Sequence, residues 1–227
     1  MAKVNRVNKS RKEKVCGRCK QIIPVGSPYL YVDFYSGRTA VRCTSCGFKP
    51  SETTENPYLQ RVYEIQEDYE EKFNNCTGED LESIKEDLVS DLEDLRDEVQ
   101  ERYDNIPEQL QDGDAGQLLQ DRIDSVESAI SDIEGVEAQD FDSWREDNGY
   151  GEDDFESWCE ENGYADEQVD LDEEDEESNI MFSHFDEIPN GLEHHREEFD
   201  TEASDKYNED HLQSVTSEIL DYLNNIE

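Results

Sequence analysis

Four of the six cysteines form two Cys-x-x-Cys pairs within the first 50 residues, Cys16 with Cys19 and Cys43 with Cys46. Cysteines at this spacing can direct both thiolates toward one point, and two such pairs complete a tetrahedral all-thiolate shell, a common form of structural zinc site. We therefore predict that residues 16–50 form a zinc finger that holds one structural Zn2+ ion through these four side chains.

The alternatives to a zinc site are two disulfides and a redox Cys-x-x-Cys motif. The chain shows no secretory signal, which argues against an oxidising compartment. A redox motif would need a βαβ context, which this region lacks. Cys76 and Cys159 have no nearby histidine partners and are predicted to be plain thiols.

The segment between the two pairs has the pattern of a β-hairpin. Residues 28–34 alternate and are rich in aromatic and β-branched types, Ser36 and Gly37 supply a turn, and residues 39–42 return as a second strand. Gly47 directly follows the last cysteine and can take the left-handed conformation that closes such a knuckle.

This region resembles a known family. The run Cys16-x-x-Cys19-Lys20-x-x-Ile23-Pro24, followed by Cys43-x-x-Cys46-x-Phe48, resembles the poly(ADP-ribose) polymerase-type zinc finger, in an all-cysteine variant, because that family usually has histidine at the position of Cys43. The resemblance implies recognition of DNA ends and nicks through backbone contacts and stacking. It covers roughly 35 of the 227 residues. Residues 105–123 weakly resemble helical hairpins of uncharacterised phage and mobile-element proteins, which implies no function.

Charge is distributed unevenly along the chain. The net charge is -42, from 20 basic and 62 acidic residues. Residues 1–50 hold 11 Lys and Arg against Glu13 and Asp33, a net of +9, which leaves 9 basic and 60 acidic residues, a net of -51, for residues 51–227. A mean hydropathy of -1.02 indicates a small core. The sequence thus describes a basic head on an acidic body.

Residues 1–15 show no apolar periodicity and are predicted to be a basic flexible arm. Such an arm on a small finger suits phosphate binding by counterion release, with tyrosines available for stacking. The predicted nucleic-acid-binding residues are Lys3, Arg6, Lys9, Arg11, Lys12, Lys14, Arg18, Lys20, Tyr29, Tyr31, Arg38 and Arg42. The alternative is that the tyrosines fill the core of the hairpin while the arm docks on the acidic body of the same chain.

Residues 57–137 are predicted to be helical. Asn56 and Pro57 supply an N-cap and a first helical residue, and the stretch Thr77–Asp80 resembles a capping box. Apolar residues at helical spacing predict helices over 79–104 and 117–134, which should fold back as an antiparallel, coiled-coil-like hairpin because neither can bury its stripe alone. A homodimer through this hairpin is the other way to bury the stripes.

Residues 138–165 contain a repeat, in which the segment 140–150 recurs 14 residues later as 154–164. Each copy is predicted to be a short helix with an Asp cap and an Asn-Gly stop. One interpretation presents the large aromatics to a protein partner; the other packs them on the helical hairpin. The residues concerned are Phe141, Trp144, Phe155 and Trp158.

The rest of the chain is interpreted from composition and periodicity. Residues 166–178 are predicted to be a disordered acidic linker, with phosphate mimicry as a sharper alternative. Residues 179–227 are predicted to be a C-terminal helical segment whose last stripe docks on the hairpin or on a second copy. The four histidines, at no recognised catalytic spacing, are expected to face solvent.

The sequence therefore predicts a mainly α protein with a small N-terminal β-hairpin zinc finger or ribbon and partly disordered acidic segments. It shows no phosphate loop, nucleophile elbow or zincin motif, so no enzymatic activity is expected. We predict a zinc-binding protein that binds nucleic acid through the finger, with an acidic body that recruits a basic protein partner or modulates binding. The alternative is an acidic interaction module or DNA mimic with a purely structural finger; salt adaptation is a third account.

No apolar run reaches the length of about 18 residues that a membrane span requires. The expected location is cytoplasmic, without a membrane partner.

Overall fold

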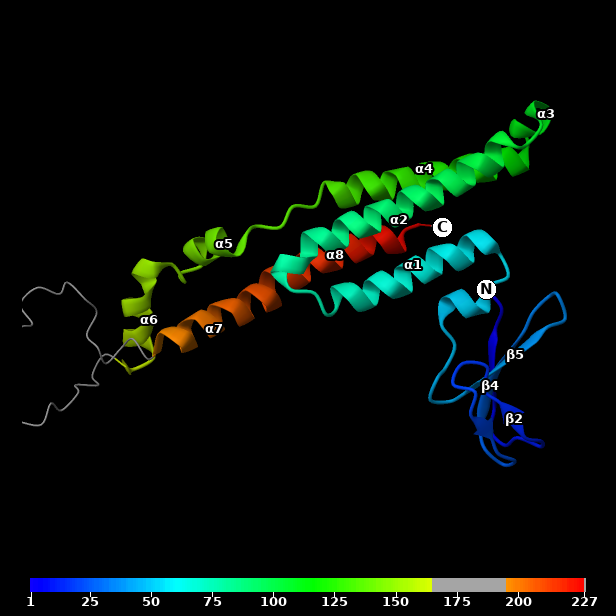
Figure 1. Cartoon of the computed structure of the whole chain (residues 1–227), viewed down its shortest axis with the longest axis horizontal. Coiled ribbons are helices and arrows are strands. Elements are labelled where there is room, and N and C mark those ends of the chain that lie inside the picture. The colour runs from blue at the N-terminus through cyan, green and yellow to red at the C-terminus, as the bar shows by residue number, and fades with distance from the viewer. Residues whose placement is uncertain (165–194, 227) are drawn as a thin grey trace, which may run out of the picture. The chain divides into compact units, whose positions relative to one another are not determined.

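The computed structural model describes residues 1–164 and 195–226. It contains two compact units, the first formed by Met1–Val136 with Thr216–Glu227 and the second by Glu137–Val215 (Figure 1). Both are mainly helical, apart from a small antiparallel sheet at the N-terminus. Among the described residues, no helix combines the length and the apolar character needed to cross a membrane.

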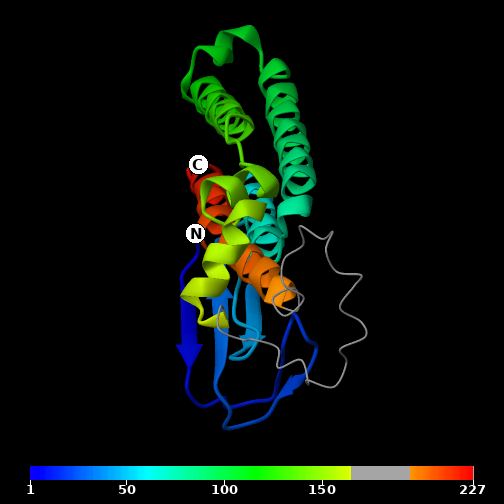
Figure 2. The ribbon, with the colours of Figure 1, turned by 90° about the vertical axis from the view of Figure 1, so that its left-hand side faces the viewer.

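The finger includes residues 1–15 as well as the predicted 16–50, and it contains five short strands. It is the dark-blue to light-blue part of the ribbon in Figure 2. Strands β1 (Val4–Val7), β4 (Tyr29–Asp33) and β5 (Thr39–Cys43) form an antiparallel sheet in the order β1-β4-β5. Strands β2 (Lys14–Val15) and β3 (Ile22–Ile23) pair separately and flank the first cysteine knuckle. The predicted hairpin is confirmed as β4 and β5, joined by a turn in which Gly37 has a φ of 83°.

The prediction that residues 1–15 form a flexible arm is wrong. Strand β1 pairs with β4 along its whole length, from Val4 opposite Val32 to Val7 opposite Tyr29. The following loop is fixed as well, because the buried Ser10 donates its backbone N–H to the Ser27 carbonyl and accepts one from Gly26 N. The sequence did not reveal this strand because Val4 and Val7 are its only apolar residues. Two apolar residues spaced by three, with cations around them, do not form a recognisable strand pattern.

The alternation of side chains gives the three-stranded sheet two distinct faces. We define the inner face as Val4, Arg6, Leu30, Val32, Ala40 and Arg42, and the outer face as Asn5, Val7, Tyr29, Tyr31, Asp33, Thr39, Val41 and Cys43. On the inner face, Val32 is fully buried and Arg42 reaches Glu52 of the 3-10 turn η1 (Pro50–Thr53). That turn leads into the helices, so the inner face is the one that joins the finger to the rest of its unit.

The helical part of the first unit agrees closely with the periodicity of the sequence. It contains α1 (Pro57–Phe73), α2 (Gly78–Asp104), the short α3 (Glu108–Gln111), α4 (Asp114–Glu134) and the end of α8 (Gln213–Asn224). Helices α2 and α4 pack side by side as the predicted antiparallel hairpin (Figure 1). Asn56 caps α1 through its side-chain oxygen, which accepts the N–H groups of Tyr58 and Leu59.

The capping box expected at Thr77 is not formed. Thr77 occupies the N-cap position of α2, but its hydroxyl donates to the Asp80 carboxylate at 2.7 Å and makes no cap with a backbone N–H. Helix α2 therefore begins where the sequence predicts, without the reciprocal side-chain bonds.

The apolar stripes of the hairpin are buried within one chain. Leu88, Leu92, Leu95 and Val99 of α2 and Ile123, Val126 and Ile133 of α4 are at most 3% exposed. Residues of α1 and α8 complete this core, and Gln66 of α1 donates to the Leu223 carbonyl of α8 at 2.9 Å. A second copy is therefore not required to cover these stripes.

The second unit contains the repeat. Its elements are α5 (Phe141–Asp147), the 3-10 turn η2 (Glu152–Asp154), α6 (Phe155–Glu161), α7 (Arg196–Lys206) and the π-helical turn η5 (Tyr207–Leu212). Both Asn-Gly stops are confirmed, with φ of 79° at Gly149 and 82° at Gly163. Asp140 caps α5 by accepting from Ser143 N, whereas Asp154 accepts instead from Gly151 N.

The interpretation of the repeat aromatics as anchors for a partner is wrong for three of the four. Trp144, Phe155 and Trp158 are at most 8% exposed, and Phe141 is half-buried. The rings of Phe141 and Trp144 pack edge-on against Tyr207, and those of Phe155 and Trp158 pack edge-on against Phe199. The two copies thus find these ring partners in η5 and α7 of their own unit, whereas the other interpretation placed the aromatics on the helical hairpin.

The expectation that histidines face solvent is wrong for the two that the structure describes. His195 is 8% exposed and stacks on Tyr164 at 3.7 Å. His211 accepts the N–H of Gln139 through Nε2 at 2.9 Å, and Tyr207 donates its hydroxyl to the Gln139 carbonyl. The predicted acidic linker 166–178, the start of the C-terminal segment, His184 and His194 lie outside the described residues.

Two buried tyrosines of α1 offer a matched stability test. The Tyr58 hydroxyl is buried and has no hydrogen-bond partner among the described residues, whereas the Tyr69 hydroxyl donates to Asp91 Oδ2 at 2.8 Å. Tyr58→Phe should therefore be neutral or stabilising by up to about 1 kcal/mol, since it removes an unsatisfied polar group and keeps the ring under Arg122. Tyr69→Phe should cost about 1–2 kcal/mol.

Urea unfolding followed by circular dichroism measures both free energies. Equal losses of stability for the two variants would show that Tyr58 has a hydrogen-bond partner after all.

Candidate metal centre

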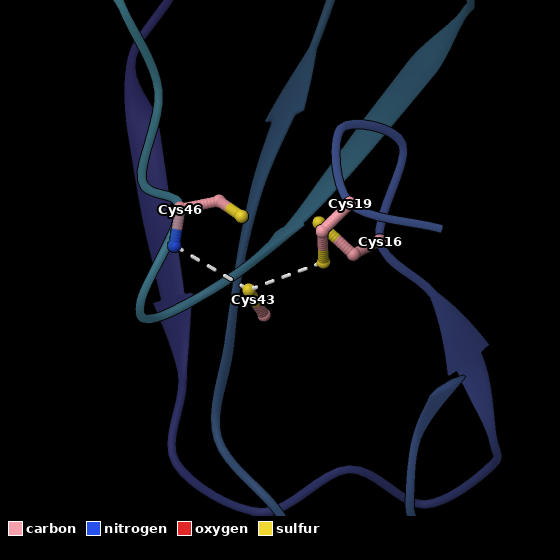
Figure 3. Close-up of side chains that lie close together, drawn as sticks. All are labelled: Cys16, Cys19, Cys43 and Cys46. Carbon is pink, nitrogen blue, oxygen red and sulfur yellow. Dashed lines mark hydrogen bonds between the residues drawn. The ribbon is translucent and has the colours of Figure 1, made fainter. Parts of the chain in front are cut away.

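The four predicted ligands meet at one point. Their sulfur atoms all lie within 4.8 Å of one another, and Cys19 Sγ lies 3.9 Å from Cys43 Sγ (Figure 3). Cys16 and Cys19 come from the knuckle between β2 and β3, while Cys43 ends β5 and Cys46 follows it. Zinc–sulfur bonds of about 2.3 Å place the corners of a tetrahedral shell about 3.8 Å apart. The donor set and its spacing therefore fit a metal ion held by four thiolates.

The two knuckles have the same backbone turn. Lys20 N donates to the Cys16 carbonyl at 3.0 Å, and Gly47 N donates to the Cys43 carbonyl at 3.1 Å. Both residues are left-handed, with φ of 61° at Lys20 and 63° at Gly47. The prediction for Gly47 is confirmed. The equivalent strain at Lys20 was missed, although its position directly after the second cysteine of a pair was the available signal.

The surroundings of the thiols shift their pKa values in both directions. Burial by itself would raise the pKa of Cys16, but hydrogen bonds from the backbone of Cys43, Cys19 and Arg18 lower it to about 6. The N–H of Cys46 lies 3.4 Å from Cys43 Sγ and lowers the pKa of Cys43. The pKa of Cys46 is raised to about 12, chiefly by its interactions with Cys43 and Cys19. The thiols therefore titrate as one coupled group, and a bound cation would favour the thiolate form of all four.

A second group of side chains ties the knuckles together. Arg18 donates to the Cys46 carbonyl at 2.8 Å and to Glu52 Oε2 at 2.6 Å, while Arg42 donates to Glu52 Oε1 at 2.8 Å. Glu52 therefore bridges the first knuckle, strand β5 and turn η1. Gly17 permits this arrangement, because a Cβ there would lie 2.1 Å from Arg42 Nη1 and 3.3 Å from the Val41 carbonyl.

The predicted nucleic-acid contacts of Arg18 and Arg42 stay predictions, but this bridge occupies both side chains. Both guanidinium groups are committed to Glu52, and the Arg42 side chain is only 14% exposed. Sequence reasoning could not find the bridge, because Glu52 lies 34 residues after Arg18 in a stretch predicted to be a linker.

The other predicted contact residues remain accessible to different degrees. Eight cations, namely Lys3, Arg6, Lys9, Arg11, Lys12, Lys14, Lys20 and Arg38, are exposed, and none forms an ion pair within the described part of the chain. Lys20 Nζ donates to the Gly17 carbonyl, and Arg38 lies over the Phe34 ring at 4.6 Å. Tyr29 and Tyr31 are half-buried on the outer face of the sheet.

No family model, curated protein or solved structure matches the chain.

The metal centre makes a direct prediction. The protein should bind one zinc ion per chain, and Cys46→Ser should lower the zinc content and loosen strands β4 and β5, because removing a ligand removes part of the folding free energy of the finger. Elemental analysis and amide hydrogen exchange measure these effects. Cys76→Ser, which changes a thiol far from the pairs in sequence, is the matched control. Equal zinc content in both variants would contradict the assignment.

The Glu52 bridge predicts a pH-dependent contribution to stability. Burial would raise the pKa of Glu52, but hydrogen bonds from Arg42 and Arg18 outweigh it and hold the pKa below its ordinary value. The stabilisation is therefore present above the ordinary glutamate pKa and is lost as the pH falls through the lowered value. At neutral pH, Glu52→Gln should cost about 1–2 kcal/mol because it replaces hydrogen bonds between charged groups.

Hydrogen exchange of β4 and β5 as a function of pH checks this expectation. The difference between the wild type and Glu52→Gln should persist down to the ordinary glutamate range and close only below it. Glu13→Gln, at an exposed carboxylate without an ion-pair partner among the described residues, should show no such difference. A gap that closes already near neutral pH would contradict the role of Glu52.

Proposed function

We propose that this is a non-enzymatic protein that binds zinc in its N-terminal finger and nucleic acid through the exposed cations of that finger. The observation that carries the proposal is the set of eight exposed cations on residues 1–38 that no carboxylate of the described chain neutralises. Phosphate groups are the anions that such a set suits, because each neutralised phosphate releases condensed counterions.

The fixed backbone of residues 1–15 supports the proposal. Arg6 lies on β1 and Lys14 on β2, while Lys9, Arg11 and Lys12 lie in the loop held by Ser10. The Ser10 hydroxyl also donates to the Lys12 carbonyl, which fixes the loop from inside. Cations on an ordered backbone lose less conformational entropy on binding than cations on a mobile arm.

The resemblance to the poly(ADP-ribose) polymerase-type finger supports the same function. In that family the finger recognises breaks in DNA through backbone contacts and stacking, and the zinc ion shapes the finger without taking part in chemistry. For this chain, Cys43 replaces the usual histidine, which leaves a tetrathiolate set that suits zinc.

For the acidic body, we propose a role in recruiting a basic protein or in tempering the affinity of the finger. Helix α2 exposes carboxylates on its outer surface, among them Glu93, Asp94, Asp97 and Glu98. Arg96 is paired with two of these carboxylates and offsets only part of this charge. The same surface favours the second candidate function, an acidic interaction module or DNA mimic in which the finger is only structural.

Salt titrations of DNA and RNA binding by the zinc-loaded full-length protein test the proposal. The triple variant Lys9→Gln, Arg11→Gln, Lys12→Gln should weaken binding and reduce the slope of log K against log salt by about 0.7–0.9 for each phosphate that is no longer neutralised. The matched control replaces Arg61, Lys72 and Arg102 of the helical body by Gln, which removes the same charge and should leave the slope unchanged.

Absence of DNA and RNA binding at low salt would overturn the proposal. If the protein then still bound basic DNA-binding proteins, the acidic interaction module would be the better description.

A further inference from the structure

The two faces of the finger's sheet differ in what covers them. The inner face carries the fully buried Val32 and the bridge from Arg42 to Glu52, while Val4 and Arg6 at its β1 edge are exposed. The outer face carries Tyr29 and Tyr31, which are only half-buried. Their ring centroids are 6.2 Å apart and their planes are tilted by 47°. The outer face is therefore a partly exposed aromatic surface on a rigid sheet.

The neighbours of the two tyrosines leave ring surface available. In the sheet register, Tyr31 lies between Asn5 of β1 and Val41 of β5, and Tyr29 lies between Val7 and Cys43. Neither phenol hydroxyl has a hydrogen-bond partner among the residues that the structure describes. Both residues are half-buried, so part of each side chain remains in contact with solvent.

The spacing of the rings selects the kind of ligand. Residues two apart on a strand are about 6.6 Å apart, whereas stacked bases along one strand of a duplex are about 3.4 Å apart. Bases inside a duplex also have both faces covered by their neighbours. Rings 6.2 Å apart can therefore each receive a base only when the bases are unstacked, as in a single strand.

A third tyrosine lies in the turn that follows the strand. Tyr35 is two positions beyond Asp33 in the turn after β4, and its side chain is fully exposed. Asp33 is the one carboxylate of β4, and it accepts a hydrogen bond from the Thr39 hydroxyl at 2.6 Å. On the outer face of β4, Tyr29 and Tyr31 are thus followed by the carboxylate of Asp33, and Tyr35 lies exposed in the adjoining turn.

Charge decides between the ligands that could use this surface. Lys3 directly precedes β1 and Lys9 follows it by two residues, and both are exposed. An acidic peptide would satisfy these cations but would leave the aromatic rings without stacking partners. A nucleic acid strand supplies phosphates and bases together.

We propose that the outer face of the finger's sheet is a platform for single-stranded nucleic acid, on which Tyr29 and Tyr31 each stack one base. The proposal rests on the proposed function and deepens it by naming the form of nucleic acid. Phosphate contacts come from the exposed cations, and the tyrosines supply the preference for unpaired bases.

The test compares short oligo-dT and oligo-dU strands with a duplex of the same length, using the zinc-loaded full-length protein. We expect single strands to bind more tightly than the duplex. Tyr29→Leu and Tyr31→Leu should each weaken single-strand binding by about 5- to 150-fold, the range that corresponds to removing one stacked base, and should leave the salt slope unchanged. Tyr31→Phe keeps the ring and should change affinity less than about 2-fold.

Controls separate a missing platform from a damaged finger. Tyr63→Leu, at a half-buried tyrosine of α1, should leave binding unchanged, and zinc content should be equal in all variants. The platform is overturned if the duplex binds as tightly as the single strands, if both leucine variants bind single strands normally, or if poly-glutamate competes equally well. In those cases the Lys9, Arg11 and Lys12 variant still reports whether the finger binds phosphates; failure to bind every nucleic acid would instead overturn the proposed function itself.

Discussion

The structure of the finger depends on four cysteine sulfurs being held at one point. Within residues 1–50, only Cys16, Ile23, Val32 and Phe34 are buried among the apolar residues, and so small a core cannot hold five short strands by itself. The sulfur cluster joins the β2–β3 knuckle to the end of β5, where Gly17 N also donates to the Val41 carbonyl. The Arg18–Glu52 bond then carries this constraint into turn η1 and the start of α1.

The second organising feature is the separation of the cations of the finger from the carboxylates of the helical body. The carboxylates of the first unit pair with only a few of the finger's cations. Glu52 takes up Arg18 and Arg42, and Glu67 of α1 lies 3.7 Å from Lys49. These three pairs lie where the finger meets the helices, so they serve packing. The remaining cations of the finger have no ion-pair partner among the described residues, because the described carboxylates of the body pair elsewhere or face solvent.

Periodicity and local motifs predicted most of the helices and the metal site, because each depends on residues close together in sequence. Asn56 with Pro57, the stripes of α2 and α4, and the Cys-x-x-Cys pairs are all of this kind. The features that the sequence did not predict depend on contacts between residues far apart in the chain. The Glu52 bridge spans 34 residues, strand β1 is defined only by pairing with β4, and the burial of Trp144 and Trp158 depends on a helix some 50 residues further along the chain.

The register of the sheet links the metal centre to the outer face. Cys43 lies directly opposite Tyr29 in the β4–β5 ladder, and Val41 lies opposite Tyr31. A one-residue slip of β5 would turn Cys43 toward the inner face and break the sulfur cluster, and it would also change the neighbours of both tyrosines. The interactions that hold Cys43 in the sulfur cluster therefore also fix the positions of Tyr29 and Tyr31. The arrangement of side chains on the outer face thus depends on the four clustered cysteines, although none of them lies at the centre of that face.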